Sequence, residues 1–149
     1  MTDISTEEVF DRLPKAVIDR DSIAFFRGML QSQLLLNRCH DCGHWFGPTW
    51  PICPECWSDD IRPTEVSGKG TIHSFTLLHA GLPAPGIDYV AGYPVALIDL
   101  DEQEGLRAAA TIVDCPNDAL EIGMPVQLAW TERDGQPFPA FRPVAETDE

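Results

Sequence analysis

The sequence has few positive charges and no long hydrophobic run. Its 149 residues include 24 acidic and 10 basic side chains, a formal net charge of −14 at pH 7, and only Lys15 and Lys69 are lysines. A surface with this charge repels nucleic-acid phosphates at long range. The longest apolar stretches, such as residues 93–100, have the length of a strand rather than of a membrane span. We therefore expect neither nucleic acid nor membrane as a partner.

The beginning of the sequence also lacks the features of a secretory signal. Residues 1–20 have no basic start, no apolar core and no small-residue cleavage site. Disulfides need an oxidising compartment, and nothing in the sequence indicates one. We therefore expect a cytoplasmic protein with reduced cysteines.

What the chain does contain is a pair of C-x-x-C motifs separated by ten residues. Each motif can form a tight turn that directs two sulfurs at one point, and the intervening loop brings the turns together. The spacing predicts one structural Zn2+ per chain. Two disulfides and a rubredoxin-like iron site are the alternatives, and spacing does not separate zinc from iron. The predicted ligands are Cys39, Cys42, Cys53 and Cys56.

The first stretch, residues 1–37, has helical patterns. Ser5 and Glu8 form a capping-box arrangement at the start of a short helix. Asp21 can cap a second helix, in which apolar residues recur at helical spacing. This N-terminal arm either packs on the rest of the chain or docks on a partner.

The remaining stretches are the metal-binding segment, residues 38–60, a β-rich segment, residues 61–144, and an acidic tail, residues 145–149. The β-rich segment contains five or six short runs of β-branched and aromatic residues in about eighty positions, with no long helix between them. This pattern predicts a small antiparallel barrel. The fold class is therefore mainly β with N-terminal helices.

Aromatic residues are concentrated in the metal-binding segment. A unit of this size has little hydrophobic core of its own, so its rings cannot all be buried within it. Some of them pack on the neighbouring domain or on another protein, where tryptophan is enriched at binding hot spots. The candidate interface residues are Trp45, Phe46, Trp50 and Trp57.

Signs of catalysis are weak. Cys115 follows Asp114, whose charge would raise the pKa of the thiol and oppose its use as a nucleophile. His73 and His79 have no acidic partner at a useful spacing in the sequence. We therefore expect no catalytic residues and do not expect the chain to be an enzyme by itself.

The order of these parts resembles the family of acyl-CoA-associated zinc-ribbon and OB-fold proteins. The resemblance extends over about residues 22–144 and implies a rubredoxin-like zinc ribbon followed by an OB-fold barrel. The matching motifs are residues 38–43, 51–56, 67–72, 93–96 and 122–126.

The resemblance implies a non-catalytic subunit that assembles with a thiolase-superfamily enzyme, a lipid-transfer-type aldolase or a hydratase acting on CoA thioesters. The implied reaction is thiolytic cleavage or formation of a β-ketoacyl-CoA. The small subunit would shape the channel for coenzyme A and stabilise its partner, in a heterotetramer of two plus two subunits. A single-stranded nucleic-acid module and a free-standing acyl-CoA carrier are the alternatives. Candidate contacts to CoA phosphates are Arg38, Arg62, Lys69 and Arg107.

Overall fold

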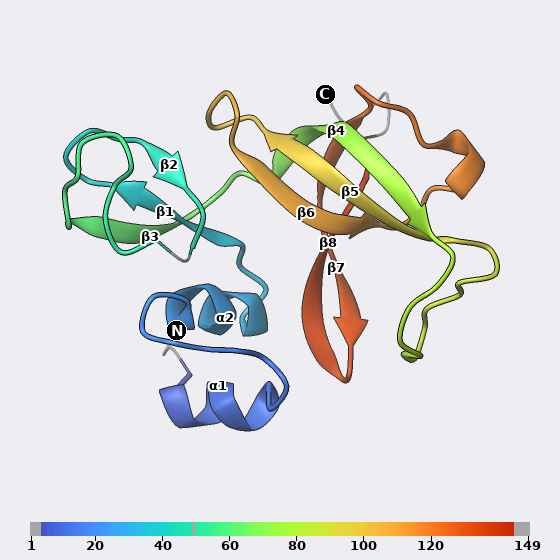
Figure 1. Cartoon of the computed structure of the whole chain (residues 1–149), viewed down its shortest axis with the longest axis horizontal. Helices are drawn as coiled ribbons and strands as arrows, with labels where there is room; N and C mark the ends of the chain where they lie inside the picture. Colours follow the sequence, from blue (N-terminus) through green and yellow to red (C-terminus); the bar gives the residue numbers. More distant parts are fainter. Residues whose placement is uncertain (1–3, 49, 145–149) are drawn as a thin grey trace. The chain divides into compact units, whose positions relative to one another are not determined.

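The chain folds into two compact units, Met1–Val66 and Ser67–Glu149. The computed structural model describes residues 4–48 and 50–144, and the elements of both units are labelled in Figure 1. The acidic tail expected at residues 145–149 lies outside the described residues. Within the described ranges, no helix combines the length and the hydropathy needed to cross a membrane.

The first helix, α1 (Thr6–Arg12), begins as the sequence predicts. Ser5 is its N-cap, and the Oγ of Ser5 accepts a hydrogen bond from the amide of Glu8 at 3.1 Å. This bond satisfies one of the amides that lack a partner in the first turn of a helix. Val9 is completely buried, so the short helix is held by packing as well as by its cap.

The second helix, α2 (Ile23–Leu30), has Ser22 rather than the predicted Asp21 as its N-cap. The Ser22 hydroxyl makes no capping bond, because it accepts a hydrogen bond from an amide three residues earlier. At the other end of α2, a Cβ added to Gly28 would lie 2.7 Å from Cδ1 of Leu35. Glycine therefore allows the helix to pack closely against the strand that follows.

A three-stranded antiparallel sheet completes the first unit, in the order β2-β1-β3. Its strands are β1 (Leu35–Cys39), β2 (Trp45–Phe46) and β3 (Ile61–Glu65). Two of the candidate ligands are part of the small buried cluster of this unit. The buried cluster contains Cys39, Phe46 and Cys53, with Ile61 packed against it. The metal site therefore replaces part of the core that so small a sheet cannot build from apolar side chains.

The second unit is a closed barrel in the order β4-β5-β6-β8-β7, with β4 paired to β7. All pairings are antiparallel except β6 with β8, which is parallel through Thr111↔Ala140 and Ile112↔Phe141. This topology confirms the predicted OB-fold-like barrel. The strands are β4 (Lys69–Leu78), β5 (Tyr93–Leu100), β6 (Arg107–Ile112), β7 (Pro125–Arg133) and β8 (Gln136–Pro143), with a 3-10 turn η1 (Asn117–Ala119) after β6.

The barrel interior is filled by aliphatic and aromatic side chains. Ile72, Ile98, Val126 and Phe141 come from four different strands and each is at most 1% exposed. Gly70, near the start of β4, allows the neighbouring strand to approach, because a Cβ there would lie 2.5 Å from the carbonyl oxygen of Asp99. The glycine is thus required by strand packing rather than by a plain turn.

Candidate metal centre

The two C-x-x-C motifs form turns of the same design, which we call the first knuckle (residues 39–43) and the second knuckle (residues 53–57). In the first knuckle the amide of Gly43 donates to the carbonyl of Cys39 at 2.9 Å. The amide of Cys42 approaches Cys39 Sγ at 3.5 Å. These bonds fix the turn so that its two sulfurs point to the same side.

The second knuckle repeats this arrangement. The amide of Trp57 donates to the carbonyl of Cys53 at 2.9 Å, and the amide of Glu55 approaches Cys53 Sγ at 3.4 Å. In each knuckle the first cysteine is buried and the second is exposed. Both turns therefore present their sulfurs in an equivalent way.

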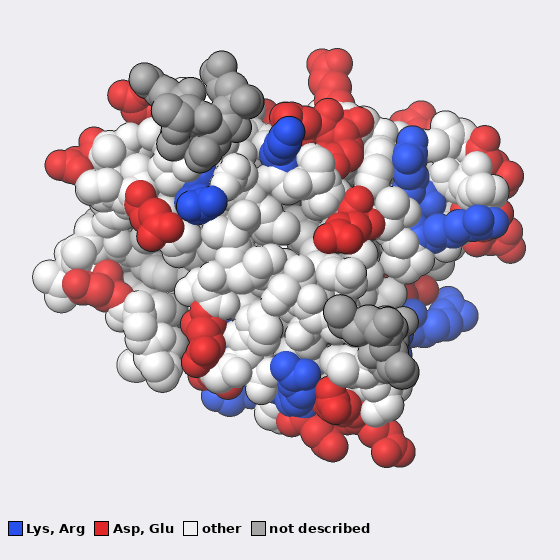
Figure 2. All heavy atoms as spheres, turned by 180° about the vertical axis from the view of Figure 1, so that it is seen from behind, with Lys and Arg blue, Asp and Glu red and all other residues white. Residues whose placement is uncertain are grey.

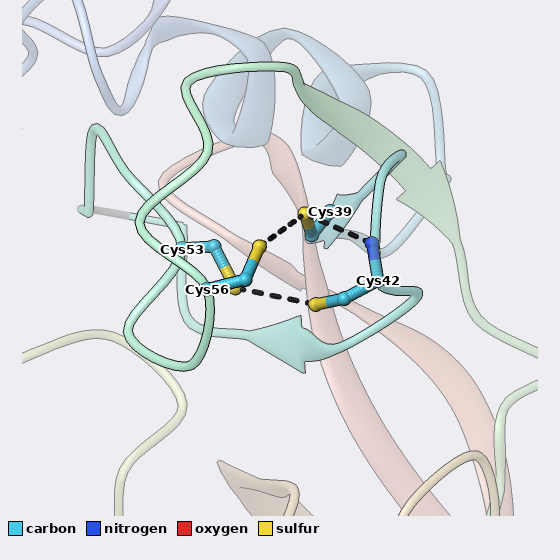
Figure 3. A group of neighbouring side chains, drawn as sticks. All are labelled: Cys39, Cys42, Cys53 and Cys56. Carbon is cyan, nitrogen blue, oxygen red and sulfur yellow. Dashed lines mark hydrogen bonds between the residues drawn. The ribbon is translucent and has the colours of Figure 1, made fainter.

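The four sulfurs point toward one another and lie within 4.8 Å of each other (Figure 3). Between the knuckles, Cys39 Sγ lies 3.5 Å from Cys56 Sγ, and Cys42 Sγ lies 3.6 Å from Cys53 Sγ. A tetrahedron with Zn–S bonds of about 2.3 Å places its sulfurs about 3.8 Å apart. The cluster therefore has the size of a closed four-thiolate metal site.

The immediate surroundings favour deprotonation of one ligand. The backbone amide of Cys42, the largest influence, lowers the pKa of Cys39 to about 7. A thiolate is the form that binds a metal ion. Four sulfur donors with no oxygen donor suit zinc or iron rather than calcium or magnesium.

The four predicted interface aromatics divide into two classes. Trp45 and Phe46 form β2 and are each 7% exposed, so neither ring is accessible to a partner, and the prediction that they form a docking surface is corrected. Trp50 and Trp57 are 55% and 77% exposed. The hydrophobic pattern of the sequence could not distinguish the buried aromatic residues from the exposed ones. The strand β2 has only two residues, which is too short to show the alternation of buried and exposed positions.

Trp57 also has an uncommon backbone conformation, with φ at +66°. The equivalent residue of the first knuckle is Gly43, with φ at +80°. Left-handed backbone is routine for glycine and unfavourable for a bulky side chain, because its Cβ crowds the neighbouring carbonyl. The second knuckle therefore contains a strained tryptophan where the first contains an unstrained glycine.

Two of the four candidate phosphate contacts come together on the ribbon sheet. Arg38 and Arg62 are directly opposite each other on β1 and β3 and line a cavity of about 270 Å³, together with His40 and Thr64. The Arg38 guanidinium lies over the ring of Trp45 at 5.0 Å. Like charges in opposite positions destabilise a sheet, and an anion between them would relieve that repulsion.

Asp60 reduces the charge of this arginine pair. Its carboxylate accepts hydrogen bonds from Arg62 at 3.1 and 3.3 Å. The hydrogen bond from Arg62 is the main reason that the pKa of Asp60 is lowered. The cavity therefore offers one guanidinium that is shared with a carboxylate and one, that of Arg38, whose Nε donates to the carbonyl of Gly43 at 3.2 Å.

The other two candidates, Lys69 and Arg107, lie in the barrel unit. Arg107 Nε donates to Asp99 at 2.8 Å. The other carboxylate oxygen of Asp99 lies 3.1 Å from His73 Nδ1. His73 thus has an acidic partner that sequence spacing did not predict, because the two residues are brought together by pairing of β4 with β5 next to a bulge at residue 73.

Cys115, the fifth cysteine, is partly buried. Burial, followed by the charge of Asp118, raises the pKa of its thiol. The direction agrees with the sequence prediction, but the charge that contributes belongs to Asp118 rather than to Asp114. The Sγ of Cys115 donates to the carbonyl of Pro116 at 3.5 Å. These surroundings oppose formation of a nucleophilic thiolate.

The barrel has a cavity of about 280 Å³ at the position where OB-folds bind ligands, between the loop after their first strand and the last hairpin. Its lining mixes polar and apolar side chains, and its one basic side chain, Arg133, lies over the ring of Phe138 at 5.0 Å. Acidic side chains are scattered over the molecular face in Figure 2. Neither feature matches the basic groove of a single-strand binder.

Comparison with known proteins places the chain in a family. The model of the ChsH2 rubredoxin-like zinc ribbon domain matches residues 28–62, and that of the ChsH2 C-terminal OB-fold domain matches residues 63–131. A solved structure described as an "Ltp2-ChsH2(DUF35) aldolase" contains a chain that is 36% identical, with a TM-score of 0.78. The match covers 88% of this chain and 100% of that one. The chain belongs to the ChsH2 (DUF35) family. Membership identifies the four-cysteine cluster as that of a zinc ribbon.

Curated relatives carry several names. A "Probable enoyl-CoA hydratase alpha subunit" from Thermomonospora curvata is 36% identical over 91% of this chain, which spans only 41% of that protein. A "DUF35 domain-containing scaffold protein" from Methanothermobacter thermautotrophicus is 37% identical over 63% of the chain and 68% of its own length. The benzoylsuccinyl-CoA thiolase subunit BbsA of Thauera aromatica is 28% identical over 70% of this chain and 71% of its own.

Proposed function

We propose that this chain is a non-catalytic subunit of a heteromeric complex that makes or breaks a carbon–carbon bond in a CoA thioester. The observation that carries the proposal is the match of 88% of this chain to the whole of a chain in an assembly named Ltp2-ChsH2(DUF35) aldolase. The thiolase subunit BbsA supports the carbon–carbon chemistry through its name, the scaffold proteins support a non-catalytic role, and the enoyl-CoA hydratase alpha subunit supports a CoA thioester as substrate but names a different reaction. In this proposal the zinc supports the ribbon and takes no part in the chemistry.

The partner that we propose is a thiolase-superfamily subunit that provides the catalytic residues. The reaction is thiolytic cleavage of a β-ketoacyl-CoA or its reverse. The complex contains two copies of each subunit, because two-fold assemblies are the commonest closed oligomers. The BbsA relative supports this version through its name.

We further propose that coenzyme A is shared between the subunits and that Arg38 and Arg62 contact one of its phosphates. Two guanidinium groups on one sheet face suit a phosphate, which accepts paired hydrogen bonds. The net charge of −14 makes the isolated chain a poor binder of an anionic cofactor. The partner therefore contributes most of the CoA site.

The test is to express the chain together with thiolase-superfamily proteins of the same organism, beginning with any encoded by neighbouring genes, and to purify the assembly. We expect a stable complex whose mass fits two copies of each subunit and which consumes one free CoA for each β-ketoacyl-CoA cleaved. Arg38→Gln together with Arg62→Gln should raise the apparent KM for CoA without dissociating the complex. A chain that stays monomeric beside every such partner, or turns over an acyl-CoA alone, would contradict the proposal.

Retro-aldol cleavage is the second candidate, favoured by the 36% identity to the aldolase chain. The two reactions differ in their need for a thiol. Thiolysis transfers the acyl fragment to a second CoA, whereas a retro-aldol reaction releases a carbonyl fragment and needs no free CoA. Product formation at the full rate after removal of free CoA would therefore assign the complex to the aldolase class.

A further inference from the structure

We propose that the second knuckle is a docking site on which Trp57 inserts into an apolar pocket of the catalytic subunit. This inference rests on the proposed function, since it names the surface through which that complex forms. It is drawn from the conformation and the exposure of one side chain.

The first step concerns backbone strain. Trp57 has a left-handed backbone at φ +66°, at the position where the first knuckle has glycine. Both knuckles make the same hydrogen bond to the carbonyl of their first cysteine, so the turn itself does not require tryptophan. The turn imposes this backbone on whichever residue occupies the position, so a bulky residue there is explained by a role of its side chain that glycine could not fill.

The second step concerns what the side chain gains within its own unit. Trp57 is 77% exposed, so its ring gains little from burial in the chain to offset the strain. Trp45, in contrast, is 7% exposed, so its ring is buried within the chain. The benefit of a tryptophan at position 57 therefore lies outside this chain.

The third step concerns the composition around Trp57. Residues 50–58 contain two more exposed apolar side chains, Trp50 at 55% and Ile52 at 37%. Glu55 lies within this segment, and Asp59 and Asp60 follow directly after it, so acidic residues border the exposed apolar side chains. Exposed aromatic side chains with a polar rim are typical of a protein–protein interface.

The composition of residues 50–58 also indicates which kind of partner binds there. An anionic cofactor or an anionic membrane would meet a chain of net charge −14, and residues 50–58 supply no basic residue to hold it. An apolar pocket on a protein suits an exposed indole. A solved structure described as an "Ltp2-ChsH2(DUF35) aldolase" names a chain of this family together with an enzyme. We therefore infer that the pocket belongs to the catalytic subunit.

The experiment uses Trp57→Gly in the full zinc-loaded chain, because glycine relieves the strain and removes the ring together. We expect the Kd for the catalytic subunit, measured by calorimetry, to rise about tenfold or more, as for a hot-spot residue. The melting temperature of the isolated variant should stay at or above the wild-type value. Loss of binding without loss of stability is an outcome that a merely structural tryptophan would not give.

The matched control is Val90→Ala, which shortens an apolar side chain that is 93% exposed in the barrel unit. This change should leave the Kd for the catalytic subunit unchanged.

A Kd for Trp57→Gly within twofold of wild type overturns the inference and leaves the proposed function intact. A fall in melting temperature as large as that of Trp45→Ala also overturns it, as does self-association of the isolated wild-type chain that Trp57→Gly abolishes. If the wild-type chain binds no thiolase-superfamily subunit, the proposed function itself is wrong.

Discussion

The two knuckles share one backbone turn and differ in the residue at its left-handed position. A Cβ added to Gly43 would meet only the Arg38 guanidinium, at 3.8 Å, so space is not what keeps this position small. In the second knuckle the same position holds Trp57, one of the most exposed large hydrophobic side chains in the described residues. The metal site thus dictates the path of the backbone and leaves the side chain at this position to other requirements.

Removal of one ligand from either knuckle tests whether the two are equivalent, and it should have the largest effect. Because metal binding and folding of so small a unit are one process, Cys39→Ser or Cys53→Ser should each lose most of a contribution on the order of 10 kcal/mol. Elemental analysis should find about one zinc in the wild-type chain and very little in both variants. The NMR signals of the barrel unit should persist.

Three outcomes would contradict this equivalence. Retention of zinc by one variant alone would show that its knuckle contributes less than the other. Visible absorbance from a ferric thiolate would replace zinc with iron. Disulfide-bonded thiols without any metal in a fresh lysate would remove the metal site altogether.

The second-largest effect is a difference in the free energy of unfolding between removal of the buried Trp45 ring and removal of the exposed Trp57 ring. Trp45→Ala should cost about 3 kcal/mol or more in free energy of unfolding, because it removes a buried ring and leaves a cavity. Trp57→Ala should change the free energy of unfolding by less than about 0.5 kcal/mol, as expected for a surface position. Urea unfolding of the zinc-loaded proteins measures both. Equal losses would mean that Trp57 packs inside its own unit.

A smaller effect on the free energy of unfolding is expected at the left-handed position itself. Gly43→Ala should lower the free energy of unfolding by about 1 kcal/mol, because alanine at φ +80° is strained. Trp57→Gly should not lower it. If both changes destabilise the ribbon equally, strain at this position is not what distinguishes the knuckles.

The smallest effect concerns the cysteine outside both knuckles. Because burial and then Asp118 raise the pKa of Cys115, less thiolate is present at a given pH than for a free cysteine. Its alkylation by iodoacetamide should therefore be slow at pH 8 and accelerate only at higher pH. Cys115→Ser should abolish this reaction in the zinc-loaded protein and leave the zinc content unchanged. Alkylation at the rate of free cysteine would show that the thiol is not shielded.

The sequence predicted the features that local spacing determines. The two C-x-x-C motifs predicted the sulfur cluster, because each turn is closed by bonds within five residues. The runs of β-branched residues predicted the barrel. The Ser5 cap was also local and was confirmed. Asp21 failed as a cap because a turn before the helix places Ser22 at the boundary instead.

Features that depend on pairing between distant segments could not be predicted. The burial of Trp45 follows from pairing of β2 with β1, and the contact of His73 with Asp99 joins residues 26 apart. The parallel pairing of β6 with β8 is of the same kind. Trp57 is different: the alignment of the two knuckles, Cys42-Gly43 beside Cys56-Trp57, is visible in the sequence and was the signal that would have indicated its strained backbone.

The position of β8 in the barrel has a consequence for how the protein is made. This strand lies between β6 and β7, so it pairs with a neighbour on each side, and it is the last of the five barrel strands to leave the ribosome. Until then β6 and β7 each expose an unpaired edge, which is a template for pairing with another chain. The ribbon, whose ligands lie within 18 consecutive residues, can bind its metal while the barrel is still being synthesised. The edge of β6 is therefore exposed to aggregation for longest, from the emergence of Ile112 until β8 follows it at Gln136.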